Sequence, residues 1–361
     1  MIEENLVSHR RFISFLSVML PAALALVSAA PASAQAVAKA ASPKNASTAK
    51  AWTVPRTPDG QPDLQGIWNS SSITPLERPV ALGNKEFYTK EEAAAYEKVR
   101  NKDLDRDRRD GSAAQDAARA YNDAWFDRGS HLGSTLRTSR VIDPPNGRFP
   151  PFTPAAQKKY DDFHAWFAAH PADGPETRNL FDRCLMFSQS GPPMIPGNYN
   201  NNYQIVQTAD TVAILSEMPH QTRIIPLGKH SSLPSQVPQW MGDSQGRWEG
   251  NTLVVETANV RFNDFSHFGT QYEGMSDENL RITERFTRTS PDTLIYRATV
   301  NDPTVYTKPW TIELPMAKTD EPIYEYACHE GNYGLAGILS GARADEKKGL
   351  SPTRGIGAPP R

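Results

Sequence analysis

The sequence predicts a mainly β protein, with an antiparallel barrel or a strongly curled sheet in the C-terminal half and a helical and irregular N-terminal half. Short segments of alternating apolar and polar residues, separated by turn signals, follow one another from about residue 200 onwards. The 30 prolines favour turns and strand edges over long helices. Neither an internal repeat nor an alternation of strands with helices is evident, so a parallel α/β sheet is not indicated.

An export signal is predicted over residues 1–34. Two arginines precede an apolar run over residues 12–27, and Ala-Ser-Ala at 32–34 gives a small-residue cleavage site before Gln35. The alternative is an N-terminal membrane anchor, but the apolar run is short for a bilayer and the cleavage site follows at once. We therefore expect a mature chain outside the cytoplasm, periplasmic or secreted, that is not bound to a membrane.

The rest of the chain is expected to divide into four parts. Residues 35–55 form a flexible leader, 56–190 a helical and irregular segment packing on the barrel, 191–345 the antiparallel β domain and 346–361 a flexible tail. The formal net charge of −2 gives no basic surplus for nucleic acid. The expected partner is a small-molecule ligand, and the sequence indicates no oligomeric state.

Two helices are predicted in the N-terminal half. Thr89 and Glu92 have the spacing of a capping box, which predicts a helix from residue 90 to about 109. The second half of this helix alternates in charge, which is typical of a solvated face rather than of a binding site. Thr153, followed by proline, predicts the start of a second helix that ends at His170.

The predicted strands are short apolar-polar segments bounded by turn residues. They cover residues 137–142, 203–208, 211–218, 223–227, 252–257, 279–288, 293–300, 310–316 and 323–328. The last of them runs into a glycine turn at residue 331.

The two cysteines, Cys184 and Cys328, are far apart in the sequence. In an oxidising compartment we expect them to form one disulfide that closes a long loop, and the alternative is two buried free thiols. Loop-closure entropy would make such a crosslink worth about 4–5 kcal/mol, although strain often lowers this value.

The run from Tyr324 to Gly334 concentrates polar and aromatic residues and is the strongest candidate for a site. It contains His329 and Glu330, which face apart in an extended chain and therefore make no dyad by themselves. Other acid, imidazole and guanidinium groups fall at strand ends, where side chains converge on a barrel mouth. The predicted catalytic residues are His329, Glu330, His220, Glu217 and Arg223.

Glu284 shares the apolar face of its predicted strand with Leu280, Ile282 and Phe286. An unpaired carboxylate is costly to bury, so either a cation meets it or it lines a wet cavity. A structural ion pair is the alternative to a role in binding.

Aromatic and amide side chains are expected to line the ligand site. The segment 240–251 holds two tryptophans and an arginine on a Gly-rich turn, either as a stacking platform or as a hairpin whose aromatics cap the core. The predicted ligand-binding residues are Tyr199, Asn201, Tyr203, Trp240, Tyr324, Tyr326, Glu284 and His267.

Strong catalytic motifs are absent from the sequence. There is no His-Glu-x-x-His, Gly-x-Ser-x-Gly, Cys-x-x-Cys, phosphate loop or dinucleotide fingerprint, so no motif requires a cofactor. No metal ligands are assigned, although a metal site built from scattered His and Glu stays an alternative.

Four motifs together resemble a family of exported bacterial proteins that carries no assigned activity. They are Pro-Asp-Leu-Gln-Gly-Ile-Trp at 62–68, Gly-Asn-Tyr-Asn-Asn-Asn-Tyr at 197–203, the segment 240–251, and Ala-Cys-His-Glu-Gly-Asn-Tyr at 327–333. The resemblance would cover most of the mature chain. The run of strands over residues 279–316 is also similar to small lipocalin-like barrels, which implies a fold and no function.

The leading hypothesis is an exported small-molecule-binding protein in which His, Glu and Asp side chains at the barrel mouth do acid–base chemistry, as in a lyase, isomerase or hydrolase. The first alternative is a non-catalytic ligand-binding protein of the envelope. The second is a metal-dependent enzyme or a metal carrier.

Overall fold

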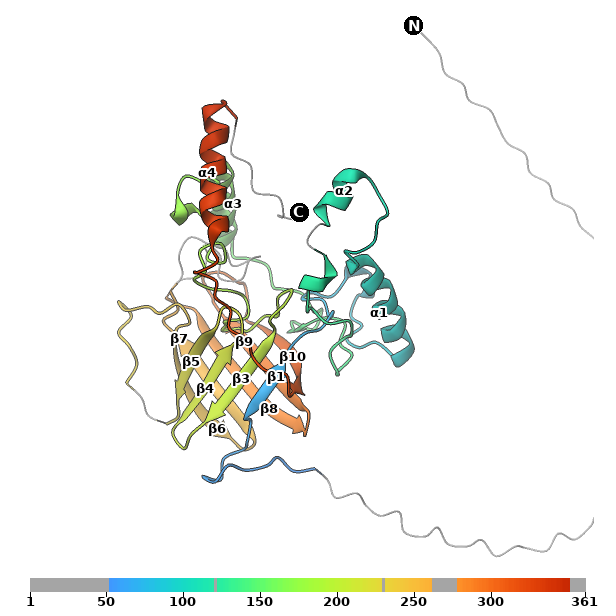
Figure 1. Cartoon of the computed structure of the whole chain (residues 1–361). Helices are drawn as coiled ribbons and strands as arrows, with labels where there is room; N and C mark the ends of the chain where they lie inside the picture. The colour runs from blue at the N-terminus through green and yellow to red at the C-terminus, as the bar shows by residue number, and fades with distance from the viewer. Residues whose placement is uncertain (1–51, 120–121, 229–230, 262–277, 351–361) are drawn as a thin grey trace, which may run out of the picture. The chain divides into compact units, whose positions relative to one another are not determined.

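The computed structural model describes residues 52–119, 122–228, 231–261 and 278–350, which Figure 1 shows in colour. The strands in this part are β1 (Gly66–Asn69), β2 (Val141–Asp143), β3 (Asn202–Gln207), β4 (Thr211–Ser216), β5 (Gln221–Pro226), β6 (Asp243–Glu249), β7 (Thr252–Ala258), β8 (Arg281–Ser290), β9 (Thr293–Asn301) and β10 (Trp310–Thr319). The predicted export signal and most of the predicted leader lie outside the described residues, as does the end of the predicted tail.

The strands form one ten-stranded sheet in which neighbours are antiparallel. Their order is β5-β4-β3-β1-β10-β9-β8-β7-β6, and the short β2 pairs with β10 outside that path. This confirms the predicted mainly β class, in the form of a strongly curled antiparallel sheet.

β8 illustrates why these segments form strands. Ile282, Glu284 and Phe286 are buried, whereas Thr283 and Arg285 between them are partly exposed. This period of two is the signature of a strand with one buried face. β9 follows the same pattern, so the two strands present one continuous apolar surface to the inside of the curl.

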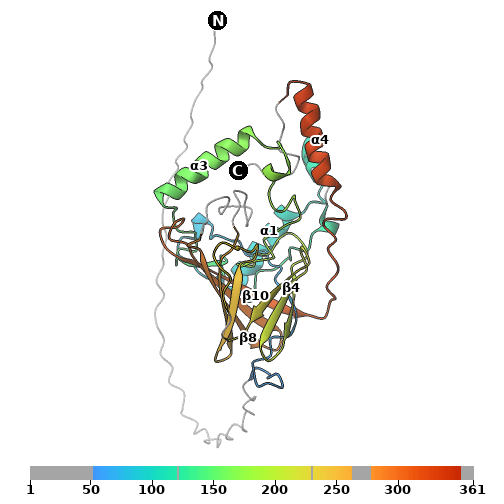
Figure 2. The ribbon, with the colours of Figure 1, turned by 90° about the vertical axis from the view of Figure 1, so that its left-hand side faces the viewer.

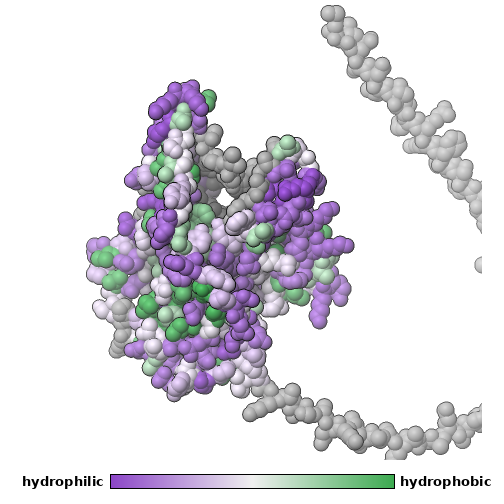
Figure 3. Space-filling view, viewed as in Figure 1, coloured by the Kyte–Doolittle hydropathy of each residue, from purple (hydrophilic) through white to green (hydrophobic). Residues whose placement is uncertain are grey.

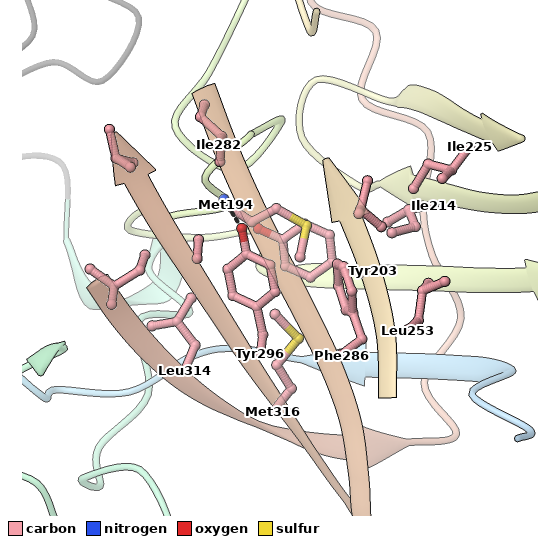
Figure 4. Packing of buried hydrophobic residues seen from close by; sticks show 14 of the residues in the cluster. Met194, Tyr203, Ile214, Ile225, Leu253, Ile282, Phe286, Tyr296, Leu314 and Met316 are labelled. Atoms are coloured by element: carbon pink, nitrogen blue, oxygen red, sulfur yellow. Dashed lines mark hydrogen bonds between the residues drawn. The ribbon is translucent and has the colours of Figure 1, made fainter. Parts of the chain in front are cut away.

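Side chains fill the inside of the curled sheet (Figure 4). Trp68 of β1, Tyr203 of β3 and Phe286 of β8 are almost completely buried. The ring of Phe286 packs against that of Tyr296, with centroids 5.0 Å apart. The Tyr296 hydroxyl accepts a hydrogen bond from the backbone N–H of Met194 at 2.9 Å, so this buried polar atom has a partner. The interior therefore serves as the hydrophobic core.

The strand order ends at β5 on one side and at β6 on the other, and the sheet is not closed between them. We call the line between these two edge strands the seam. Leu227, directly after β5, forms a β-bridge with Gly246 of β6, and the N–H of Gly228 donates to the Gly246 carbonyl at 3.2 Å. The approach depends on glycine, because a Cβ at position 246 would lie 2.8 Å from the Leu227 side chain. The edges therefore meet at one point without closing a continuous ladder.

The helices are α1 (Lys90–Leu104), α2 (Ala113–Ala118), α3 (Pro154–Ala169) and α4 (Tyr333–Lys347). The predicted capping box of α1 is confirmed, since the Thr89 hydroxyl accepts from the N–H of Glu92 and the Glu92 carboxylate accepts from the N–H of Thr89. The Thr153 cap of α3 is also confirmed. Figures 1 and 2 show α3 and α4 at one end of the sheet, opposite the end where residues 52–65 lie.

The predicted strand at 323–328 is wrong, because this segment is irregular and leads into α4. Both edges of the preceding strand, β10, are already paired with β1 and β9, so a following segment has no edge to join in a hairpin. Pro322 directly before the segment also lacks the N–H that a ladder needs.

Hydrophobic residues also gather on the outer face of β3, β4 and β5 (Figure 3). Val206, Ala213 and Ile224 are aligned across these strands, and Val206 and Ile224 are exposed.

Among the described residues, no helix has the length and apolar composition needed to cross a bilayer.

Candidate functional site

Cys184 and Cys328 form a disulfide, with Cα atoms 5.7 Å apart. The predicted pairing is confirmed, and it indicates an oxidising, non-cytoplasmic compartment. The bond fixes the segment before α4 against the loop that precedes β3. It therefore brings residues 144 positions apart in sequence to one place on the protein surface.

A cleft of about 500 Å³ surrounds this bond, and we call it the disulfide cleft. Its aromatic lining residues are Phe181, Phe187, Tyr199 and Tyr326. The ring of Phe187 lies edge-on to Tyr326, with centroids 5.7 Å apart. Aromatic faces that converge on a concave surface are typical of small-molecule sites.

Asn332 joins the two walls of the disulfide cleft. Its side-chain amide donates to the carbonyl oxygen of Asp182 at 3.0 Å, and its side-chain oxygen accepts from the N–H of Leu335 at 3.1 Å. The same side chain thus caps α4 and holds it to the opposite segment. This double role explains why the helix begins beside the disulfide.

The charge of the disulfide cleft is acidic. Its ionisable lining groups other than tyrosine are the carboxylates of Asp182 and Glu325. Asp182 pairs with Arg178, with Nη2 2.6 Å from Oδ2, and Glu325 is exposed. The cleft therefore favours a neutral or cationic ligand over an anion.

The structure places His329 and His220 at the same end of the sheet, but neither lines the disulfide cleft. His329 and Glu330 are exposed in the turn between Cys328 and Gly331, which both line the cleft. His220 is exposed in the turn after β4. Its neighbour Gln221 donates to the Leu185 carbonyl at 2.8 Å, so both turns lie against the segment that holds the disulfide. Their catalytic role stays a prediction.

Glu217 is 2% exposed and belongs to a polar network that the sequence did not reveal. Its carboxylate accepts from the Asn202 side chain at 2.9 Å and from the N–H of Tyr324 at 3.3 Å. Asn69 donates in turn to the Asn202 side chain at 2.8 Å. β1, β3 and the end of β4 are thereby tied to the segment that carries Glu325.

Asp127 lies next to this network. Desolvation is the first cause that raises the pKa of its carboxyl, repulsion from Glu217 is the second, and the Asn69 side chain opposes both. Phe126, the preceding residue, packs edge-on against Tyr199 of the cleft, with centroids 6.4 Å apart. Asp127 is not among the residues predicted from the sequence, and the aromatic and acidic composition of residues 122–129 is the signal that could have found it.

The raised pKa of Asp127 predicts an unusual pH dependence. The folded state holds the Asp127 proton more tightly than the unfolded state, so this group favours folding at low pH. That contribution is lost as pH rises through the folded-state pKa. Asp127→Asn should therefore raise the melting temperature, relative to the natural chain, more at pH 7 than at pH 3.5.

The matched control for this measurement is Asp123→Asn. Burial works against ionisation of Asp123, but the Arg128 side chain and the N–H of Arg106 outweigh it and lower the pKa. Its stabilising contribution is present above the unfolded-state pKa and is lost as pH falls, so Asp123→Asn should cost more at pH 7 than at pH 3.5. Melting curves in which both variants shift in the same direction would contradict the assignment.

Arg223 and Glu284 meet inside the curled sheet. The Arg223 Nη1 and Nη2 atoms donate to the two Glu284 carboxylate oxygens at 2.9 and 2.5 Å. The Tyr296 hydroxyl donates to the same carboxylate at 2.8 Å. The sequence left two possible surroundings for Glu284, a cation or a wet cavity. The structure shows the cation, Arg223, beside it. Arg223 is thus held in the core, away from the disulfide cleft.

The other predicted ligand-binding residues do not all lie in one place. Tyr199 and Tyr326 line the disulfide cleft, whereas the Tyr324 side chain is 66% exposed. Tyr203 is in the core, where its hydroxyl donates to the Gln189 carbonyl at 3.0 Å. Asn201 is fully buried, and its side chain holds the backbone of Gly197 and Asp127. His267 lies outside the described residues.

The segment 240–251 forms β6 and the turn that joins it to β7, so it belongs to a hairpin, as one of its two interpretations required. Trp248 is half-buried and packs against the core. The Arg261 guanidinium lies over the ring of Trp240, 4.9 Å from its centroid.

Within the described residues, no three His, Cys, Asp or Glu side chains are placed to hold a metal ion.

Comparison with known proteins adds no further constraint on the site. No protein-family model, no curated protein and no solved structure matches this chain. The resemblance to exported bacterial proteins therefore stays a prediction from the sequence motifs. The functional assignment depends on the geometry of the described residues.

Proposed function

We propose that this chain is an exported small-molecule-binding protein, periplasmic or secreted, and that its ligand occupies the disulfide cleft. The observation that supports the proposal is the convergence of four aromatic side chains around the disulfide, in a cleft of about 500 Å³. Such a volume accommodates a small organic molecule. The export signal predicted at residues 1–34 and the disulfide agree on the compartment.

The charge and the aromatic faces indicate the class of ligand. Glu325 repels anions, since Arg178 already neutralises Asp182, and the faces of Tyr199 and Tyr326 attract cations that lie over them. A neutral or cationic molecule with an aromatic or aliphatic body fits this lining. Benzyltrimethylammonium is a suitable probe because it combines a ring with a permanent positive charge.

Tyr326→Ala should weaken the binding of benzyltrimethylammonium about five- to thirtyfold, because one aromatic contact with a cation is worth roughly 1–2 kcal/mol. Isothermal titration of the mature, oxidised protein measures the change. Tyr324→Ala is the matched control: it removes the same side chain two positions away, but from an exposed site outside the cleft. Equal affinities for the two variants would overturn the proposal.

Acid–base catalysis is the second candidate function. It is supported by the position of His329 and Glu330 between two cleft-lining residues, where their side chains can reach a bound ligand. His329→Ala separates the two functions. It should leave the affinity for the probe within twofold whether or not the protein is an enzyme. It should abolish turnover if the protein is an enzyme.

A further inference from the structure

A second cleft lies beside α1 and differs in charge from the disulfide cleft. We call it the arginine cleft, because Arg100, Arg128 and Arg140 line it together with one carboxylate, that of Asp103. Its volume is about 640 Å³, and its walls come from α1, the segment after β1 and the loop before β3, with Arg128 and Arg140 contributed by other segments. Of the charged stretch that the sequence suggested to be merely solvated, Asp103 and Leu104 line this cleft.

Arg140 is a partly buried cation of this cleft whose hydrogen bonding is incomplete. Its Nη2 donates to the Ser72 carbonyl at 2.8 Å, whereas its Nε is buried and has no hydrogen-bond partner. Among the described residues, no carboxylate lies within 4.0 Å of its guanidinium nitrogens. Burial lowers the pKa of Arg140 to about 10, which still leaves it charged at neutral pH.

A partly buried cation without an anion is unfavourable, and an anionic ligand would compensate its charge. Arg78 provides a contrast within the same region. It is 2% exposed, but its Nε donates to the Thr138 hydroxyl at 2.9 Å and its Nη1 donates to the Pro145 carbonyl at 2.8 Å. Local structure therefore satisfies Arg78 with hydrogen bonds, whereas the charge of Arg140 has no anion beside it among the described residues.

The backbone holds Arg140 in a fixed place. Its N–H donates to the Pro75 carbonyl at 2.7 Å, and its carbonyl accepts from the N–H of Glu313 at 2.8 Å. The first of these bonds is made to a residue that also lines the cleft. A guanidinium on such a support is organised for binding before the ligand arrives, which lowers the entropic cost of association.

The other charges around the cleft leave a positive balance. Arg128 is neutralised by Asp123, with Nη2 2.7 Å from Oδ1. Arg100 is exposed on α1 and makes no ion pair with any described residue. Asp103, one turn further along α1, offsets one of the two remaining cations. One net positive charge is thus available to a ligand.

The remaining lining is mainly apolar. Tyr96 and Leu104 come from α1, and Ile73 and Leu76 come from the segment after β1. A planar guanidinium pairs with a carboxylate through two parallel hydrogen bonds, and an apolar wall beside it suits a hydrocarbon or aromatic body. We propose that the arginine cleft binds an organic acid, with its carboxylate on Arg140 and its apolar body against Tyr96 and Leu76.

This site is independent of the proposed ligand of the disulfide cleft, which has the opposite charge preference. The loop before β3 borders both clefts, since Gly197 and Asn198 line the arginine cleft and Tyr199 lines the disulfide cleft. The two sites are therefore neighbours. Tyr326→Ala should change the affinity of the disulfide cleft alone, so the two proposals can fail separately.

The test is an isothermal titration of the mature, oxidised protein with benzoate in low-salt buffer without phosphate. Benzoate should bind, benzamide should bind at least about tenfold more weakly, and added salt should weaken benzoate binding. Inorganic phosphate should bind more weakly than benzoate, because it cannot use the apolar wall. Equal binding of benzoate and benzamide, or tighter binding of phosphate, would overturn the proposal.

Variants then assign the site. Arg140→Gln should weaken benzoate binding at least about tenfold, as expected for a charge-assisted hydrogen bond, and Arg100→Gln about threefold. Arg100→Gln keeps the test valid if Arg140→Gln does not fold, because Arg100 is exposed. The control is Lys98→Gln, which removes one positive charge from the same helix at an exposed position outside the cleft. A similar loss in Lys98→Gln and Arg100→Gln would show a non-specific charge effect and reject the site.

Discussion

Replacing Arg223 by methionine should lower the free energy of unfolding by about 3–5 kcal/mol, because it leaves the Glu284 carboxylate buried without its cation. The two residues are 4% and 0% exposed, and two parallel hydrogen bonds join them. Burial alone would lower the pKa of Arg223, but the Glu284 carboxylate outweighs it and the pKa is raised. Urea unfolding of the natural and variant chains, with the disulfide intact, measures the difference.

Two further variants test the cause of this loss. The double variant Arg223→Met with Glu284→Leu removes both charges and should recover at least about 2 kcal/mol of the loss. Arg285→Met breaks an exposed ion pair, in which Arg285 Nη1 lies 2.9 Å from Glu249 Oε2. This change should cost less than about 1 kcal/mol. If Arg285→Met cost as much as Arg223→Met, burial would not be the reason for the effect.

Removing the disulfide should cost roughly 2–5 kcal/mol, the range expected for a native crosslink that closes a long loop. The bond spans 144 positions and anchors the irregular segment between β10 and α4. The described hydrogen bonds from this segment to the rest of the protein include those of Tyr324 with Glu217 and Asn332 with Asp182. The double variant Cys184→Ala with Cys328→Ala should therefore show a lower unfolding midpoint in urea.

Limited proteolysis supplies a second measurement of the same effect. Cleavage within residues 320–332 should become faster in the double alanine variant, because the segment loses its covalent anchor. A reducing agent should reproduce the change in the natural chain and have no effect on the variant. Unchanged stability on reduction would show that the hydrogen bonds of Asn332 and Glu217 are sufficient to hold this segment.

Strand periodicity made much of the fold predictable from the sequence. The alternation around Glu284 placed it correctly on the buried face, and the need for a nearby cation followed from the cost of burying a charge. The identity of the cation was not predictable from spacing. Arg223 is on β5 and Glu284 is on β8, six steps apart in the strand order. The curl of the sheet brings the two side chains together.

The C-terminal region shows where the sequence was insufficient. α4 contains three glycines, at 334, 337 and 341, which lower helix propensity and hid the helix. The cap that starts it depends on Asn332 contacting a distant segment. Tertiary context therefore decided this element, and local pattern did not.

The candidate site was predicted in part for the same reason. The assumption of a strand at 323–328 put Tyr324 and Tyr326 on one face, but only Tyr326 lines the disulfide cleft. The correct pairing of the cysteines nevertheless located the cleft, because a covalent bond does not depend on strand register. The arginine cleft could not be predicted, since its walls come from several separate segments that only the fold brings together.

The seam between β5 and β6 has a consequence for the behaviour of the protein in a crowded compartment. Unpaired strand edges are templates on which other chains add strands, which leads to aggregation. In the described residues, the two terminal strands of the sheet order approach each other at Leu227 and Gly246, so the edges shield each other at that point. The curl thus reduces the length of strand edge that is open to self-association, without a continuous ladder to close the sheet.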